Sequence, residues 1–189
     1  MDAVRLGPPR VSVYTVPTDA PESDGTLAWD ATTTLVLVQI GAGGCDGLGF
    51  SYADAATGRL VRDSLAGVIE GRNALDIAGA RGAMTTAIRS LGRPGIAAMA
   101  IAAVDNALWS LHVVHRCAVE RSARRLVRSG IGMVKMKVGR EPQPTTTCIE
   151  RMLFDGALAP IDGALRPDRS RLGIGLALKT QDAAKFAVA

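Results

Sequence analysis

The chain has 189 residues, a formal net charge of +4, 48% hydrophobic and 21% charged residues. This composition predicts a folded globular protein and excludes a disordered one, because it holds enough apolar side chains to form a core. The positive excess is small and aromatic residues make up only 4%, whereas nucleic-acid-binding domains usually concentrate both. The composition therefore argues against a nucleic-acid partner.

Three cysteines, Cys45, Cys117 and Cys148, stand far apart in the sequence. Their odd number and wide spacing argue against a disulfide framework and favour a reducing compartment. The first ten residues lack the apolar stretch of a signal peptide, and the longest apolar run, 96–104, is too short to span a membrane. We expect a cytoplasmic protein without a membrane partner.

Three segments in the first third of the chain read as β-strands. Residues 11–16, 32–40 and 48–53 are rich in β-branched and apolar side chains, and Pro17 ends the first of them. Residues 18–30 are rich in Asp, Pro, Ser and Gly, which predicts a loop. Strands that follow one another through such connections predict a three-stranded antiparallel meander.

Helical patterns follow the third strand. Residues 60–70 and 78–91 are candidate helices, and Pro94 suits the first turn of a long helix over 95–114. The first half of this long helix is apolar nearly all round, which predicts deep burial.

The second half of the chain has a different pattern. Helix and strand signals alternate, in the order helix, strand, helix, strand, helix, over residues 118–129, 134–139, 148–160, 171–178 and 181–189. Such alternation predicts a parallel sheet with crossover helices and places a domain boundary near residues 115–120.

The strand VKMKVG, residues 134–139, carries a notable pair of charges. Lys135 and Lys137 alternate with apolar residues, so on a strand both ammonium groups lie on one face. Burial and a neighbouring like charge would both lower a lysine pKa toward neutrality, where the neutral amine can act as a base. The alternative is a pair of solvated lysines on an exposed strand.

The long helix GIAAMAIAAVDNALWSL and the later VKMKVG strand occur in the order typical of one family. In these features the chain resembles the enolase superfamily, in its mandelate racemase and muconate-lactonizing branch, over most of residues 10–140. The resemblance implies an α+β capping domain, here 1–115, followed by a TIM-type (β/α)₇β barrel, here a partial one over 116–189. It also implies Mg²⁺-dependent removal of the proton α to a carboxylate of a hydroxy or sugar acid, as in a racemase, epimerase or dehydratase.

The same resemblance implies roles for four residues. Lys137 takes the position of the catalytic base and Lys135 that of its electrostatic neighbour. Two capping-domain loops that close over substrate in the family correspond to 18–30 and 50–54, which makes Trp29 and Tyr52 candidate substrate contacts. The alternative is that Trp29 packs on the surface and Tyr52 fills the core.

The chain also departs from the family pattern. The next strand of the family carries an Asp metal ligand, but the aligned stretch LGIGLAL has Gly175 and Ala177 at the Asp and Asn positions, and neither can bind Mg²⁺ through its side chain. A first barrel strand is missing from residues 116–132, and a whole barrel needs about 250 residues. Mg²⁺ is therefore expected for the family, without ligands identified in this chain.

Three hypotheses for function follow from these observations. The first is an enzyme of the family that is impaired or inactive as this short chain, acting on a small carboxylate. The second is a non-catalytic remnant that self-associates, as a homo-oligomer. The third is a nucleic-acid binder that uses one helix face made by four arginines, for which a plain solvated face is the simpler interpretation: Arg121, Arg124, Arg125 and Arg128.

Overall fold

The computed structural model describes residues 4–18, 22–23, 28–29, 32–120, 148–158, 166, 168 and 170–188. At 22–23, 28–29, 115–120 and 148 it describes the backbone alone. The VKMKVG strand and the arginine face predicted from the sequence lie outside the described residues.

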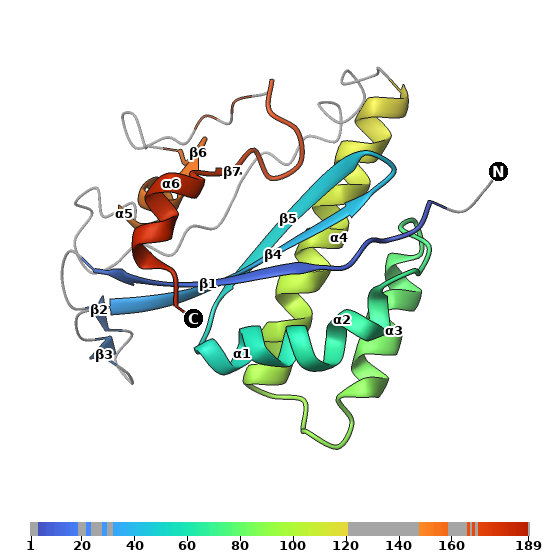
Figure 1. Ribbon diagram of the computed structural model, residues 1–189, viewed down its shortest axis with the longest axis horizontal. Coiled ribbons are helices and arrows are strands. Elements are labelled where there is room, and N and C mark those ends of the chain that lie inside the picture. The colour runs from blue at the N-terminus through green and yellow to red at the C-terminus, as the bar shows by residue number, and fades with distance from the viewer. Residues whose placement is uncertain are drawn as a thin grey trace.

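The centre of the fold is a three-stranded antiparallel sheet of β1 (Arg10–Pro17), β4 (Thr32–Ala42) and β5 (Cys45–Tyr52), in the order β1-β4-β5 (Figure 1). β4 and β5 are joined by a two-residue turn, Gly43 and Gly44, with φ of 58° and 76°. Two successive positive φ angles suit the tight hairpin turns whose twist matches that of the strands. The predicted antiparallel meander is confirmed.

Helices cover one face of this sheet. They are α1 (Ala55–Leu60), the π-helical turn η1 (Val61–Leu65), α2 (Ala66–Ile69), α3 (Ile77–Ala87) and α4 (Ile96–Glu120). The Asp54 carboxylate accepts a 2.8 Å hydrogen bond from the Ala56 amide, and Asp76 accepts one of 2.9 Å from the Gly79 amide. The Asp54 cap explains why the first helix begins at Ala55, five residues before the predicted start, and the Asp76 cap begins α3 at Ile77.

α4 approaches β5 very closely because two glycines face it. A Cβ atom added at Gly49 would lie 2.3 Å from the carbonyl oxygen of Ala103 and 2.3 Å from the Ala107 nitrogen. Gly47 is equally tight against Leu111. Only glycine permits this contact between a helix backbone and a strand backbone.

α4 also satisfies the length and composition expected of a membrane-crossing helix over Ile96–Val114, although the sequence had suggested that its apolar run was too short. Half of that window is buried within the protein itself. Its buried residues include Ala100, Val104 and Leu108, which pack into the main core. We therefore interpret α4 as a core helix.

The other face of the sheet is covered by the C-terminal part of the chain. Figure 1 shows this part on the side of the sheet opposite α1, α2 and α3. Its elements are α5 (Cys148–Leu153), β6 (Phe154–Asp155), β7 (Ala177–Leu178), α6 (Thr180–Ala183) and the 3₁₀ turn η3 (Ala184–Phe186). Together with the sheet they form a second core, whose buried residues are Tyr14, Val16, Leu35, Leu37, Leu48, Ile149, Leu153, Phe154 and Ala183.

Two local predictions for this part need correction. The strand predicted over 171–178 is reduced to β7, which pairs antiparallel with β6 rather than in a parallel sheet. The helix predicted over 148–160 ends at Leu153, because Phe154 turns into the second core, where it is 1% exposed. The positive φ angles of Gly173 and Gly175, 66° and 77°, bend the chain before β7.

The end of the chain is attached directly to β1. The Val188 amide donates a 2.8 Å hydrogen bond to the Val13 carbonyl, and Ala187 forms an antiparallel bridge with Tyr14. α4 continues through the predicted boundary near residue 115 to Glu120. The division of the chain into two domains at that point stays a prediction.

Candidate functional site

Tyr52 ends β5 at an edge of the second core and is 39% exposed. Its ring meets Phe50 edge-on with centroids 6.1 Å apart, and Phe50 in turn stacks on Phe154 at 5.5 Å. The side chain is therefore supported by an aromatic row, with its hydroxyl at the edge. Tyr52 is thus partly packed and partly accessible, and its role as a substrate contact stays a prediction.

Glu150 of α5 is the partner of Tyr52. The Tyr52 hydroxyl donates a hydrogen bond to Glu150 Oε1. The other oxygen, Oε2, is buried and has no hydrogen-bond partner within the described residues. Sequence reasoning missed Glu150, because the two residues are 98 positions apart and no local pattern links them.

Trp29 lies in a two-residue strand. β2 (Glu22–Ser23) and β3 (Ala28–Trp29) pair antiparallel, with Glu22 opposite Trp29. This small hairpin falls within the predicted loop 18–30. Only the backbone is described there, so the proposed substrate contact of Trp29 stays a prediction.

Lys135 and Lys137 fall within residues 121–147, outside the described part of the chain. Their assignment as base and electrostatic neighbour stays a prediction. Of the four candidate residues, the structure describes the surroundings of Tyr52 alone.

An ion-pair cluster holds the loop before β7. Arg171 Nη2 donates to Asp155 Oδ2 at 2.6 Å, and Arg171 Nε lies 3.7 Å from Asp168 Oδ2. The hydrogen bond from Arg171 and its positive charge lower the pKa of Asp155. The same hydrogen bond and the negative charge of Asp155 raise the pKa of Arg171. Hydrogen bonds from the Ser170 hydroxyl and amide lower the pKa of Asp168. Both carboxylates therefore already have partners within the loop, Arg171 for Asp155 and Ser170 with Arg171 for Asp168.

The described residues do not fit a magnesium ion. They contain no group of three His, Cys, Asp or Glu side chains close enough to hold a metal. Gly175 and Ala177, at the family's Asp and Asn positions, lie in a loop and in the short strand β7, and the nearby carboxylates of Asp155 and Asp168 are paired with Arg171. Since Mg²⁺ needs several oxygen ligands, this part of the structure provides no such site.

A largely apolar groove of about 490 Å³ lies between α4 and the loop before β7. None of the described residues that line it is charged, and Trp109 and Ile174 at its sides are 54% and 44% exposed. Ser110 also lines the groove and accepts a 3.3 Å hydrogen bond from the Leu48 amide. Its remaining lining residues are Gly49, Phe50, Asn106, Val113, Gly173 and Leu176.

Comparison with protein families gives one match, "Mandelate racemase / muconate lactonizing enzyme, N-terminal domain", over residues 11–116. This range is more than half of the chain and contains the whole three-stranded sheet and its helical face. The chain belongs to the mandelate racemase and muconate lactonizing enzyme family. The suspected membership of the enolase superfamily is thereby confirmed, as is the capping-domain fold.

Solved structures of the family extend the comparison. A mandelate racemase/muconate lactonizing enzyme-like protein from Rubrobacter xylanophilus is 27% identical, with a TM-score of 0.76, and the match covers 97% of this chain and 100% of that chain. A racemase from Streptomyces coelicolor A3(2) with bound magnesium is 27% identical at a TM-score of 0.55, over 73% of this chain and 48% of that one. These matches extend beyond the capping domain into the region predicted as a partial barrel.

L-talarate dehydratase from Polaromonas sp. JS666, complexed with Mg and L-glucarate, is 30% identical at a TM-score of 0.50, over 60% of this chain. The chain spans only 32% of that enzyme and about a third of several other family structures. A comparison with curated proteins found no match.

Proposed function

We propose that this chain is a capping-domain form of the family in which the ancestral reaction is impaired or lost, and that it acts by binding. The ancestral reaction is Mg²⁺-dependent removal of the proton α to a carboxylate of a hydroxy or sugar acid. If the chain retains activity, its substrate is a small carboxylate of this kind, Lys137 is the base and Lys135 adjusts its pKa.

One observation carries the proposal. α5 to η3 pack on the capping sheet itself, with Phe154 1% exposed and the Val188 amide bonded to β1. The connection from α4 to α5 is therefore residues 121–147, far shorter than the roughly 250 residues of a barrel. The missing carboxylate cluster among the described residues supports the same conclusion, because the family's enediolate intermediate needs an electrophile near the base.

The test is solvent deuterium exchange at the α-carbon of a panel of hydroxy acids that includes L-glucarate, followed by proton NMR with and without 10 mM Mg²⁺. We expect no exchange, and no heat of Mg²⁺ binding at millimolar concentration by calorimetry. Mg²⁺-dependent exchange that is lost in Lys137→Ala and retained in Lys179→Ala would contradict the proposal. Lys179 is a suitable control because its side-chain amine donates to the Arg151 carbonyl, at 2.7 Å, and lies outside the VKMKVG strand.

A second candidate function is self-association through the groove beside α4. Trp109 and Ile174 line the groove and are 54% and 44% exposed, and the lining residues in the described part of the chain carry no charge. Interface centres are depleted of charge and rich in aromatic residues, with tryptophan often dominant. These features support a homo-oligomer formed by apolar contact.

Light scattering over a concentration series tests this second candidate. We expect a mass above that of one chain, reduced by Trp109→Ser and unchanged by Leu91→Ser. Leu91 is 62% exposed and does not line the groove. A single-chain mass at all concentrations would remove self-association.

A further inference from the structure

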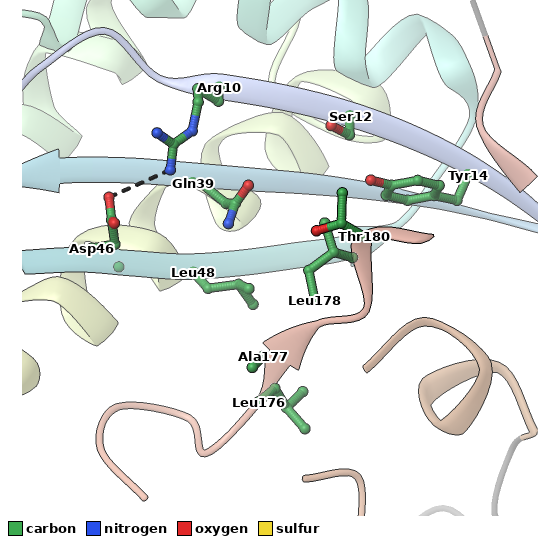
Figure 2. A pocket seen from close by; sticks show the side chains of 11 residues that line it. Arg10, Ser12, Tyr14, Gln39, Asp46, Leu48, Leu176, Ala177, Leu178 and Thr180 are labelled. Carbon is green, nitrogen blue, oxygen red and sulfur yellow. Dashed lines mark hydrogen bonds and ion pairs between the residues drawn. The ribbon is translucent and has the colours of Figure 1, made fainter. Parts of the chain in front are cut away.

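A polar trough lies on the C-terminal face of the sheet, at the end that the C-terminal elements leave open (Figure 2). It has a volume of about 510 Å³ and is bounded by the three strands on one side and by residues 176–180 on the other. Figure 2 shows Arg10, Gln39 and Asp46 at one end and Tyr14 with Thr180 at the other.

Strand register brings the polar side chains together. Arg10 of β1 is opposite Gln39 of β4, and Gln39 is opposite Leu48 of β5, so the three side chains form one row on one face. Asp46, two residues before Leu48, points to the same face, and its Oδ1 lies 3.5 Å from Arg10 Nη2. None of these neighbours is adjacent in the sequence.

Tyr14 supplies the decisive observation. The residue is 6% exposed, its hydroxyl points along the trough in Figure 2, and it has no hydrogen-bond partner among the described residues. The ring is buried while the hydroxyl reaches the solvent of the trough, so this O–H can donate to a ligand there without first breaking a bond within the protein. The half-buried side chains of Ser12 and Gln39 are likewise without a hydrogen-bond partner in the described part of the chain.

The charged side chains of the trough indicate what kind of ligand could hydrogen-bond to these unpaired groups. Among the described residues that line the trough, Arg10 and Asp46 are the only ones with charged side chains. A ligand with one charge is attracted by one of them and repelled by the other, whereas a ligand with both charges complements the pair. At 3.5 Å, with each side chain about two-thirds exposed, the pair leaves most guanidinium donors and carboxylate lone pairs free.

We propose that this trough binds a small zwitterion of the α-amino-acid class with a hydrogen-bonding side chain. Its carboxylate would pair with Arg10 and its ammonium group with Asp46, while the side chain reaches past Gln39 and Ser12 to accept from the Tyr14 hydroxyl. Tyr14 follows Arg10 by four positions in β1, a distance of roughly 13 Å along a strand, which leaves room for a side chain of several atoms. The proposal does not depend on whether the family reaction is retained.

The experiment uses the full chain and L-glutamine as the probe, with calorimetry as the readout. Two analogues serve as matched ligands: glutaramate, which lacks the ammonium group, and 4-aminobutanamide, which lacks the carboxylate. We expect L-glutamine to bind and both analogues to bind at least tenfold more weakly. No binding of L-glutamine at 20 mM, or equal binding of either analogue, would overturn the proposal.

Variants locate the site. Tyr14→Phe removes only the unpartnered hydroxyl and should weaken L-glutamine binding about three- to tenfold. Thr86→Val, which removes an exposed hydroxyl outside the trough, should leave binding unchanged. Arg10→Gln and Asp46→Asn should each abolish measurable binding, with the exposed Arg89→Gln as control.

Thermal unfolding without ligand checks that each variant folds. We expect Tyr14→Phe to unfold at the wild-type temperature, because its hydroxyl has no partner to lose. If Tyr14→Phe folds normally and still binds L-glutamine like the wild type, the assignment of the trough is wrong.

Discussion

The two faces of the sheet are packed in different ways. On the helical face, α4 touches β5 through Gly47 and Gly49, with no side chain from β5 between the two backbones. On the C-terminal face, aromatic side chains such as Phe154 form a core at one end, while Arg10 and Gln39 stay uncovered at the other. On the helical face the backbones are in direct contact, so even an added methyl group has no room. The C-terminal face combines a buried core with an open polar trough.

The largest expected effect is on the C-terminal face. Phe154→Ala should lower the free energy of unfolding by about 3 kcal/mol or more, because a large ring that is 1% exposed and stacks on Phe50 is removed. If the C-terminal part opens separately, hydrogen exchange will accelerate at the Lys179 and Val188 amides, which bond to Leu153 and Val13. Urea unfolding and amide exchange measure both effects.

Phe186→Ala is the matched control for this change. Phe186 packs at the margin of the same core and is only half-buried. It should cost clearly less than Phe154→Ala. An equal loss from both variants would show that the C-terminal face does not depend on the buried ring.

The next effect concerns the helical face. Gly49→Ala should destabilise the protein by about 2 kcal/mol or more, because the new methyl group meets the α4 backbone, which cannot move aside as a side chain can. Gly82→Ala in α3 is the control, since no atom lies within 4 Å of its added Cβ. There we expect a gain of about 0.5 kcal/mol from the reduced entropy of the unfolded chain. Similar losses from both substitutions in urea unfolding would refute the close contact of α4 with β5.

The smallest effect is electrostatic and again concerns the C-terminal face. The hydrogen bond and the charge of Arg171 lower the pKa of Asp155 below its usual value of 3.8. A carboxyl whose pKa is lower in the folded state contributes stability above the unfolded pKa and loses it as the pH falls through the folded pKa. We expect stability to decline below about pH 4, and Arg171→Met to raise the pKa of Asp155 in a carbon NMR titration. An Asp155 pKa that Arg171→Met does not change would argue against the ion pair in solution.

The fold of the capping domain could be predicted from local sequence patterns. β-branched runs over 11–16 and 32–40 marked the strands, and the Gly43–Gly44 turn that joins β4 to β5 requires residues that tolerate positive φ. Both signals are local, because a strand pattern and a tight turn involve residues close together in the chain. The same was true of α4, although its end at Glu120 was predicted six residues too early.

The candidate sites could not be predicted in this way. Tyr52 meets Glu150 across 98 residues and Arg10 meets Asp46 across 36, and such contacts depend on strand register and on where the C-terminal elements pack. The segment 171–178 was interpreted as a parallel barrel strand, because its apolar pattern suits any buried strand. Such a pattern does not indicate which strand it pairs with or in which direction.

By itself, the sequence determined the family, the antiparallel meander and the buried helix beside it, since these follow from side-chain periodicity and turn residues. Only the tertiary structure decided that Phe154 and Val188 return to the capping sheet and that the Tyr14 hydroxyl faces the trough without a partner among the described residues. The physical reason is that burial and hydrogen-bond pairing depend on contacts between segments that are distant in the sequence. Local patterns indicate only which face of each segment is apolar or polar.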